Sequence, residues 1–313
     1  MGAEGVKNIA VIGAGLMGHG IALEFASAGY HVRINDRSPE LLEAALERAR
    51  TGMDALAKAG RIGTSEVEPA LARLHTCADL AEAAQDADVV VEAVFENLAL
   101  KQEIFAALDR VAPAHAILLS NTSTYLPSAL ASATKRPDRV AVAHYFNPPH
   151  LLPIVELVRG PETSDETMET ARDLLVRAGK KPAIVNREIL GFIGNRLQNA
   201  LFREALALVQ NGVATAEDVD TVVKYGFGRR LAVAGPFEVW EQIGWDLVSV
   251  IAGELFRDIE DTKDLPRVLT EKVESGDLGT KTGRGFYEWP EGAAEALRQR
   301  MAKALMEMSR WDI

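Results

Sequence analysis

The chain has 313 residues, more than the roughly 250–300 at which a single hydrophobic core usually stops growing, so two domains are expected. Hydrophobic residues make up 48% and charged residues 25% of the chain, which excludes disordered and fibrous classes. The formal net charge is −11 and no Lys/Arg-rich block offsets it, which argues against nucleic acid as a partner.

The cysteine content and the apolar runs bear on location. Cys77 is the single cysteine of the sequence, so it has no partner for an intramolecular disulfide and fits a reducing compartment. The start Met1–Val6 lacks the basic region and apolar run of an export signal. Apolar runs such as Val89–Val91 are far shorter than the roughly 20 residues that span a bilayer. We therefore expect a cytoplasmic protein that does not cross a membrane.

The first part of the chain, from Lys7 to about Val185, alternates short β-branched runs with longer helical patterns. This alternation predicts a mostly parallel sheet flanked by helices. Several runs are almost entirely apolar, as expected for strands that are covered on both faces. The predicted strands are Asn8–Ile12, His31–Asn35, Asp88–Ala93, Ile117–Ser120, Val140–His144, Ile154–Val158 and Ala183–Val185.

Two long helical regions complete the predicted organisation. Leu41–Leu74 predicts a helical hairpin inserted between the second and third strands. From Gly191 onward the strand signals stop, which predicts an all-helical second domain and a domain division into residues 1–187 and 188–313. The predicted helices there are Phe192–Gln210, Ala216–Val223, Phe237–Phe256, Leu265–Glu274 and a last helix in Glu291–Trp311 that packs on this domain or on a partner subunit.

The first strand leads into a glycine-rich loop, Gly13-Ala14-Gly15-Leu16-Met17-Gly18, and then a helix, which is the context that the G-x-G-x-x-G pattern requires. Gly13 permits the tight turn, Gly15 lets a pyrophosphate approach the backbone, and Gly18 lets the helix pack closely. The helix N-terminus favours the negative charge of the phosphates. The loop therefore predicts a dinucleotide site.

Asp36 ends the second strand, where a carboxylate accepts hydrogen bonds from ribose hydroxyls and repels a 2′-phosphate. NAD is therefore the expected cofactor rather than NADP. The neighbouring Arg37 leaves one alternative open, since its guanidinium could stack on adenine or meet a 2′-phosphate.

Ligands of such sheets lie beyond the carboxyl ends of the strands, so polar residues at those ends are candidate site residues. Val140–Ala143 leads into His144, and Glu156 is a lone carboxylate within an apolar strand. A buried Glu156 needs a partner, and we hypothesise that the partner is His144. A carboxylate on one ring nitrogen would fix the tautomer and raise the basicity of the other, so that His144 could take a hydroxyl proton.

Two further strand ends carry polar residues. Asn121–Thr124 follows the strand Ile117–Ser120 and can hold a substrate oxygen and the nicotinamide ribose, or can cap a helix. Glu96–Lys101 follows the strand Asp88–Ala93 and opens the next helix, where it is either a site segment or a solvated first turn.

Taken together, these segments resemble the L-3-hydroxyacyl-CoA dehydrogenase family over nearly the whole chain. The matching segments are Gly13–Gly18, Glu96–Lys101, Asn121–Ser123, His144–Pro148, Glu156, Gly191–Arg196, Gly235–Glu238 and Gly279–Tyr287. The resemblance implies that His144 is the general acid/base, that Glu156 orients it, and that Ser123 and Asn195 bind the substrate oxygen. It further implies that Glu96, Lys101, Asn147 and Lys281 contact NAD, and that the helical domain forms a homodimer.

The implied reaction is the reversible oxidation of an L-3-hydroxyacyl-CoA to the 3-ketoacyl-CoA, a reaction of fatty acid metabolism. Donors at Ser123 and Asn195 would stabilise charge that develops on the oxygen. No His/Cys/Asp/Glu cluster with the spacing of a known metal site occurs, and hydride transfer needs none, so no metal is expected.

The chain departs from the acyl-CoA enzymes at Pro149–Ile154, at an insertion Gly228–Ala234 and in the helix beyond Tyr287. These departures are more similar to the branch that contains L-gulonate 3-dehydrogenase and lambda-crystallin. A CoA thioester needs basic residues for its phosphates, of which the hairpin offers Lys58 and Arg61. A free hydroxy acid needs one clamp, such as Arg229 or Arg230. The thioester stays the first expectation because the hairpin and Gly279–Tyr287 resemble the acyl-CoA enzymes.

Two other functions fit these residues less well, and the first of them is not an enzymatic function. A non-catalytic NAD-binding protein, such as a crystallin-like protein, accounts for the glycines and Asp36 but not for the set His144, Glu156, Ser123 and Asn195. A dehydrogenase of the 6-phosphogluconate type shares the domain order but relies on a catalytic lysine in its helical domain, so the paired His144 and Glu156 argue against it.

Overall fold

The computed structural model describes residues 2–311, which form two compact units. One unit contains the described residues up to Asn195 together with Ala304–Arg310, and the other contains Arg196–Lys303 and Trp311. In the described chain, no helix combines the length and the apolar character that crossing a membrane requires.

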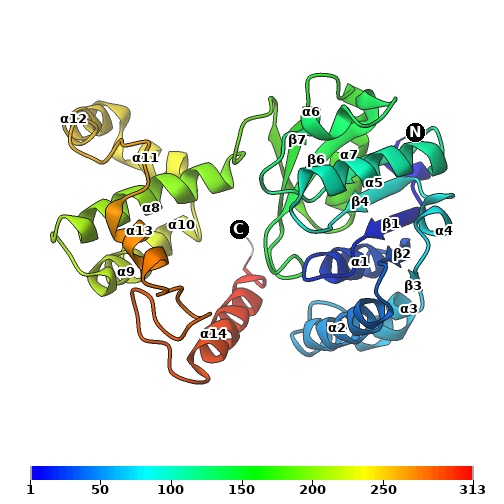
Figure 1. Ribbon diagram of the computed structural model, residues 1–313, viewed down its shortest axis with the longest axis horizontal. Helices are drawn as coiled ribbons and strands as arrows, with labels where there is room; N and C mark the ends of the chain where they lie inside the picture. The colour runs from blue at the N-terminus through cyan, green and yellow to red at the C-terminus, as the bar shows by residue number, and fades with distance from the viewer. Residues whose placement is uncertain (1, 312–313) are drawn as a thin grey trace. The chain divides into compact units, whose positions relative to one another are not determined.

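The first unit is built on an eight-stranded sheet with the order β3-β2-β1-β4-β5-β6-β7-β8 (Figure 1). Strands β1 to β6 pair in parallel, β7 runs antiparallel to β6, and β8 pairs in parallel with β7. The predicted α/β class with a mostly parallel sheet is therefore confirmed. The strands are β1 Asn8–Ile12, β2 His31–Asn35, β3 Leu74–Cys77, β4 Val89–Glu92, β5 Ile117–Ser120, β6 Val140–Tyr145, β7 Ile154–Arg159 and β8 Lys181–Val185.

Strand β3 is a feature that the sequence reading missed. Its four residues, Leu74–Cys77, have a polar centre, and only the first and last are buried, so they lack the apolar run of the other strands. The predicted hairpin Leu41–Leu74 is correspondingly wrong in its second arm. The long helix α2 (Pro39–Lys58) is followed by a 3₁₀ turn, Thr64–Glu66, and a helix of only five residues, α3 (Val67–Leu71), which leads into β3.

Helices cover both faces of the sheet. Helices α4 (Leu80–Ala84), α5 (Leu98–Val111) and α6 (Pro127–Ala131) bury a hydrophobic cluster that includes Phe105 and Leu118 on one face. Helix α1 (Gly18–Ser27) lies on the other face, where an added Cβ at Gly18 would contact the side chain of Val11. Side chains alternate between the two faces along a strand, so both faces of β1 are filled. Helix α7 (Asp165–Arg177) connects β7 to β8.

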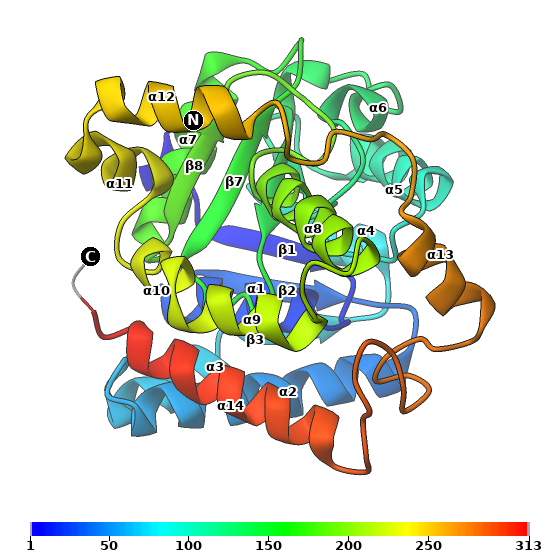
Figure 2. The ribbon, with the colours of Figure 1, turned by 90° about the vertical axis from the view of Figure 1, so that its left-hand side faces the viewer.

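The second unit is helical. The prediction of one helix over Phe237–Phe256 is wrong: Gly244, with φ of +94°, separates α11 (Pro236–Ile243) from α12 (Trp245–Leu255), as Figure 2 shows. The short helix α10 (Phe227–Leu231) was not predicted. The remaining helices are α8 (Gly194–Gln210), α9 (Ala216–Tyr225), α13 (Arg267–Glu274) and α14 (Ala293–Met308), whose end belongs to the first unit.

Candidate active site

The glycine-rich loop after β1 has backbone requirements that only glycine meets. Gly13 has φ of +108°, and a Cβ there would lie 2.6 Å from the carbonyl oxygen of Ala93. A Cβ at Gly18 would lie 1.8 Å from the carbonyl oxygen of Gly13. At Gly15, by contrast, a Cβ would meet no atom within 4 Å. Gly15 therefore faces open space, as a loop that receives a pyrophosphate requires.

A cavity of about 760 Å³ lies at the carboxyl ends of the strands in the first unit. Its wall comes from the loops that follow β1, β2, β3, β4 and β5 and from helix α5, so one cleft joins five strand ends. The polar and loop residues that line it include Gly13, Gly15, Leu16, Met17, Asp36, Arg37, Asp79, Glu96, Glu103, Asn121 and Ser123. Its size and its position fit a dinucleotide.

Asp36 ties the second strand end to the glycine loop. Its Oδ2 atom accepts a hydrogen bond of 2.9 Å from the backbone N–H of Ala14, and its Oδ1 atom accepts one of 3.0 Å from that of Ser38. The adjacent Arg37 is highly exposed and lies 3.6 Å from Glu103, which lines the same cavity. The lining at this end of the cavity therefore contains two carboxylates, those of Asp36 and Glu103, and one guanidinium, that of Arg37.

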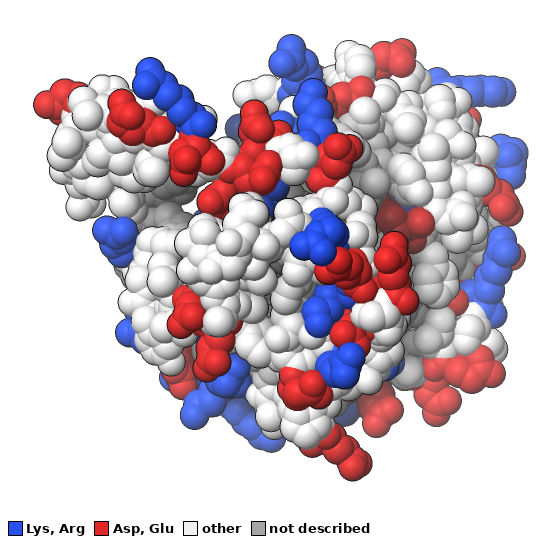
Figure 3. Space-filling view, turned by 60° about the vertical axis from the view of Figure 1, so that its left-hand side comes forward, with Lys and Arg blue, Asp and Glu red and all other residues white. Residues whose placement is uncertain are grey.

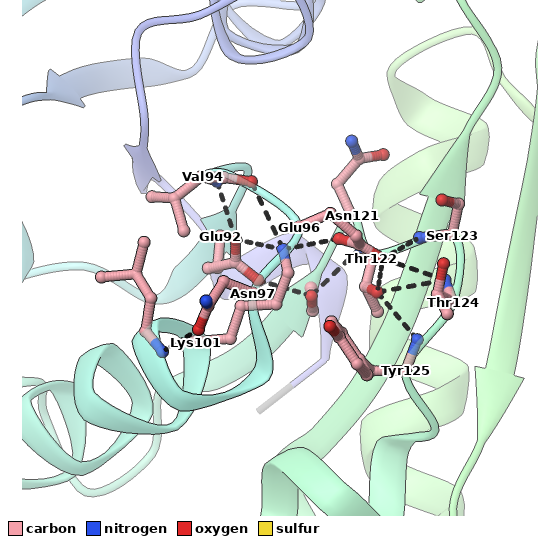
Figure 4. A network of polar contacts seen from close by, with 12 residues as sticks. Glu92, Val94, Glu96, Asn97, Lys101, Asn121, Thr122, Ser123, Thr124 and Tyr125 are labelled. Atoms are coloured by element: carbon pink, nitrogen blue, oxygen red, sulfur yellow. Dashed lines mark hydrogen bonds and ion pairs between the residues drawn. The ribbon is translucent and has the colours of Figure 1, made fainter. Parts of the chain in front are cut away.

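Glu92 ends strand β4, and its carboxylate is fully inaccessible to solvent. This residue was not predicted to belong to the site. Figure 4 shows the network around it. Its Oε1 atom accepts hydrogen bonds from the N–H of Val94 and the Nζ of Lys101, each under 3 Å, and its Oε2 atom accepts one of 2.6 Å from the Oγ of Ser120. The sequence feature that could have identified Glu92 is a charged residue at the end of an otherwise apolar strand, Val89–Glu92.

Lys101 links Glu92 to the cavity wall. Its side chain is only 1% exposed, and its Nζ lies 2.8 Å from Glu92 and 3.2 Å from Glu96. The ammonium therefore faces two protein carboxylates, and its surroundings fit a residue that positions Glu96. Glu96 itself lines the cavity.

Glu96 holds the turn after β5. One of its oxygens accepts a hydrogen bond of 2.5 Å from the hydroxyl of Thr122 and further bonds from the N–H groups of Ser123 and Thr124 (Figure 4). Partial burial raises the pKa of Glu96, but the hydrogen bonds and Lys101 outweigh it, so that the pKa lies below its ordinary value. An ionised Glu96 thus fixes the backbone of Ser123.

The predicted pairing of His144 with Glu156 is present in the geometry. The two residues are directly opposite each other in the antiparallel pair β6–β7. The Nδ1 atom of His144 lies 2.7 Å from the Oε2 atom of Glu156, and both side chains are buried. With the carboxylate ionised, Nδ1 carries a proton and Nε2 is left with the lone pair of a base.

The second oxygen of Glu156 binds the start of helix α8. Oε1 accepts hydrogen bonds of 2.8 Å and 2.7 Å from the N–H groups of Ile193 and Gly194. Burial, the largest single influence, raises the pKa of Glu156, but the bonds from His144, Gly194 and Ile193 together hold it below its ordinary value. A carboxylate at this helix N-terminus is also favoured by the helix dipole.

Aromatic rings surround the imidazole. The ring of Phe146 lies 5.0 Å and that of Phe192 lies 5.6 Å from the ring of His144, measured between centroids. Phe192 is buried and has φ of +48°, a conformation uncommon outside glycine. A Cβ at Gly194 would lie 2.4 Å from the ring of Phe146. The rings and Gly194 thus restrict the orientation of the imidazole.

The remaining predicted site residues are distributed as follows. The Nδ2 atom of Asn195 donates a hydrogen bond of 3.2 Å to the carbonyl of Ser123, so these two predicted oxygen-binding residues are brought together. The Oδ1 atom of Asn121 accepts a hydrogen bond of 2.9 Å from the N–H of Tyr145, which places the end of strand β5 beside His144.

Asn147 is exposed and precedes a cis peptide bond to Pro148. Lys281 is exposed and belongs to the second unit.

Comparison with known proteins identifies both parts of the chain. Residues 8–189 match the family model described as 3-hydroxyacyl-CoA dehydrogenase, NAD binding domain, and residues 191–289 match the model of the C-terminal domain of the same enzymes. The resemblance inferred from the sequence motifs is thereby confirmed.

Individual relatives differ in their substrates. The chain is 39% identical to the probable 3-hydroxybutyryl-CoA dehydrogenase of Bacillus subtilis, over 91% of this chain and 98% of that protein. It is 32% identical to the 5-formyl-3-hydroxy-2-methylpyridine 4-carboxylate 5-dehydrogenase of Mesorhizobium japonicum, over 97% of this chain and 98% of that protein. A solved structure of a dehydrogenase of this second type, described as an NAD+-dependent dismutase, matches with a TM-score of 0.90 and 31% identity, over 97% of this chain and 98% of its own.

Proposed function

The chain belongs to the 3-hydroxyacyl-CoA dehydrogenase family and is an NAD-dependent dehydrogenase that acts on hydroxyl groups, and on this premise we propose that His144 is its general acid/base. The observation that carries the proposal is the buried hydrogen bond of 2.7 Å between His144 and Glu156. It leaves Nε2 of the imidazole able to accept a hydroxyl proton. Glu156 is proposed as the residue that orients His144.

In the proposed reaction, NAD supplies the hydride acceptor when it is bound. Nε2 of His144 takes the proton of the substrate hydroxyl as a hydride leaves the carbon that bears this hydroxyl. In the reverse direction Nε2 returns the proton to the oxygen. The hydroxyl of Ser123 and the amide of Asn195 would donate hydrogen bonds to the substrate oxygen, where negative charge develops.

We propose that the cavity in the first unit holds the dinucleotide. Gly13, Gly15, Leu16, Met17 and Gly18 would line the pyrophosphate, and Asp36 the adenosine ribose. Near the nicotinamide we place Glu96, Asn121, Ser123 and Asn147. The contact of Lys281 with NAD, implied by the family resemblance, stays a prediction. Lys101 would act through Glu96, since its ammonium is buried between Glu92 and Glu96.

The first candidate substrate is an L-3-hydroxyacyl-CoA, which would be oxidised to the 3-ketoacyl-CoA in fatty acid metabolism. It is supported by the match of both family models and by the 39% identity to a probable 3-hydroxybutyryl-CoA dehydrogenase. The predicted domain roles accompany it: residues 1–187 as the NAD-binding domain and residues 188–313 as the substrate and dimerisation domain.

A free acid is the second candidate substrate, and two observations favour it. Arg61 is one of the two basic hairpin residues that could bind the phosphates of CoA. Its guanidinium instead donates a hydrogen bond to the carbonyl of Ser309, in the C-terminal segment of the chain. Arg310 of the same segment donates to the carbonyl of Ala59. The relative that acts on a pyridine carboxylate also covers 97% of this chain, whereas the 3-hydroxybutyryl-CoA enzyme covers 91%.

The experiment that separates the candidates follows absorbance at the NADH wavelength. The purified chain is assayed with NADH and acetoacetyl-CoA, and with NAD and a panel of free 3-hydroxy acids and aromatic carboxylates that carry a hydroxymethyl or formyl group. Turnover of acetoacetyl-CoA alone supports the first candidate, and turnover of free acids alone supports the second. Failure of every substrate with NAD and NADH would contradict the proposed acid/base function.

We also propose that the helical unit forms a homodimer. Within the described residues 211–311 no residue is buried, although this stretch includes helices α9 to α13. Phe237 and Phe256 are exposed by 74% and 76%, and Trp245 by 48%. A second copy would remove this apolar surface from water, which is the main favourable term in association. A monomer in sedimentation velocity at all concentrations tested would contradict the proposal.

The surface charge supports a small-molecule substrate rather than nucleic acid as the partner. On the face that Figure 3 shows, basic side chains are scattered among acidic ones and form no continuous patch. The formal net charge is −11. Cys77 is buried and is not part of a disulfide, which fits our proposal of a cytoplasmic enzyme.

A further inference from the structure

A buried lysine outside the proposed site, Lys180, occupies the turn between α7 and β8. Its side chain is 3% exposed. Its Nζ lies 2.7 Å from a carboxylate oxygen of Glu24 and donates hydrogen bonds of 2.6 Å and 3.2 Å to the carbonyls of Pro149 and Leu152. A lysine ammonium has three protons, and each of these has an acceptor.

The three acceptors belong to two segments that matter for the proposed reaction. Glu24 lies on α1, the helix that starts at Gly18, directly after the glycine-rich loop. Pro149 and Leu152 lie in the segment 146–153, which leaves strand β6 just beyond His144. Lys180 therefore connects the helix that follows the cofactor loop to the segment that follows the proposed base.

Two further contacts show how closely these segments meet. A Cβ at Gly20 of α1 would lie 2.5 Å from the Cγ of Pro149. The Nζ of Lys180 also lies 5.9 Å from the ring centre of Tyr145, the neighbour of His144. Because Phe146, the first residue of the segment, packs against the imidazole, a shift of the segment would reach His144.

The charges in this region depend on each other. Burial raises the pKa of Glu24, and Lys180 opposes that rise through its charge and its hydrogen bond. Removal of one partner from a buried ion pair leaves an uncompensated charge, whereas removal of both charges is often tolerated. The pair can therefore be tested for positioning separately from stability.

We propose that Lys180 is a positioning residue for His144. By holding α1 and the segment 146–153 together, it sets the distance between the imidazole and the nicotinamide of a dinucleotide bound at the glycine loop. This inference rests on the proposed function, because it needs His144 to exchange a proton during hydride transfer. Misplacement of about 1 Å can cost on the order of 10²-fold in rate.

The test compares Lys180→Met, the double variant Glu24→Gln/Lys180→Met and the control Lys181→Met, which alters the exposed first residue of β8. Each protein is assayed with the substrate that the wild-type chain turns over in the panel above. We measure kcat, KM, the dissociation constant of NAD, the melting temperature and the isotope effect with deuterium in place of the transferred hydride, on the hydroxyl-bearing carbon for an oxidation or on NADH for a reduction.

We expect kcat to fall by about tenfold or more in both Lys180 variants, with a larger isotope effect and with NAD affinity changed less than about threefold. The double variant should regain melting temperature but not kcat. The NMR signal of the His144 Nδ1 proton should shift in both Lys180 variants and stay in place in Lys181→Met.

Several results would overturn the inference. They are a kcat within about twofold of wild type in either folded Lys180 variant, a kcat that recovers together with the melting temperature, or unfolding of both variants at the assay temperature. If the wild-type chain is active and one of these results is obtained, only the role of Lys180 is rejected and the proposed function stands. An inactive wild-type chain rejects the proposed function and this inference together.

Discussion

His144 and Glu156 face each other across the antiparallel strands β6 and β7, and the Nδ1 atom of one lies 2.7 Å from a carboxylate oxygen of the other. The second oxygen of the same carboxylate binds the N–H groups of Ile193 and Gly194. One buried side chain therefore fixes both the tautomer of the imidazole and the start of helix α8.

The first prediction concerns Glu156→Gln. The amide has only one acceptor oxygen, so its NH₂ group must face either His144 or the two backbone N–H groups. We expect kcat to fall on the order of 10²-fold, within the range of general acid–base catalysis. The control is Glu162→Gln, at an exposed position after β7, which should leave kcat unchanged. Equal kcat values for the two variants would remove Glu156 from the mechanism.

The pKa of Glu156 makes the same variant a stability test. The folded pKa is lowered, so the carboxylate contributes stability that is present above its ordinary pKa and is lost as the pH falls through the folded value. Urea unfolding at neutral and acidic pH should show a smaller acid-induced loss of unfolding free energy in Glu156→Gln than in wild type.

A second prediction concerns Gly194→Ala. The new Cβ would lie 2.4 Å from the ring of Phe146, which must move and thereby disturb the packing on His144. We expect a lower kcat and a destabilisation of about 1–3 kcal/mol, as for other cases of overpacking. Gly253→Ala in α12 is the matched control, because a Cβ there meets no atom within 4 Å. Chemical denaturation and steady-state kinetics of both variants check this; unaltered kinetics in Gly194→Ala would contradict it.

The third prediction concerns the choice between NAD and NADP. In Asp36→Asn the side chain loses the charge that repels a 2′-phosphate, and one of its two backbone hydrogen bonds must be rebuilt. We expect the ratio of kcat/KM for NAD to that for NADP to fall by about tenfold or more, equivalent to roughly 1.4 kcal/mol. Glu103→Gln removes a charge from the same cavity without touching the glycine loop and should change the ratio less. A ratio unaffected by Asp36→Asn would show that specificity arises elsewhere.

The fourth prediction concerns His150 and acid stability. Burial, with His19 and Lys180 nearby, lowers the pKa of His150 to about 4, and its Nδ1 atom has no hydrogen-bond partner among the described residues. The unfolded chain takes up this proton at the ordinary pKa of 6.5, so the free energy of unfolding decreases as the pH falls from above 6.5 toward 4. His150→Leu should reduce this decrease, measured by urea unfolding at several pH values. The same decrease in both proteins would contradict the prediction.

The sequence predicts much of the fold because the information is local. Apolar runs identify the strands β1 and β5 with their bounds, and the strand-to-loop context identifies the glycine loop. Strand β3 was missed because its polar centre, His75-Thr76, hides it, and the break at Gly244 was missed because a glycine is tolerated inside many helical patterns.

The candidate site also contains residues that the sequence predicts and contacts that it does not. The need of a buried carboxylate for a partner led from Glu156 to His144. The contact of Glu156 with Ile193 and Gly194 joins residues that are far apart in the chain, and no local pattern reports it. Glu92 was missed because its significance depends on Lys101 folding back from the next helix.

The central claim is that the imidazole of His144 exchanges the proton during hydride transfer. The most direct measurement is single-turnover hydride transfer in His144→Gln, alongside the dissociation constant of NAD and the control His115→Gln, an exposed histidine that contacts Asp88. We expect a rate about 10²–10⁴-fold below wild type in His144→Gln, with NAD affinity nearly unchanged and His115→Gln fully active. A His144→Gln variant that transfers hydride at the wild-type rate would contradict the claim.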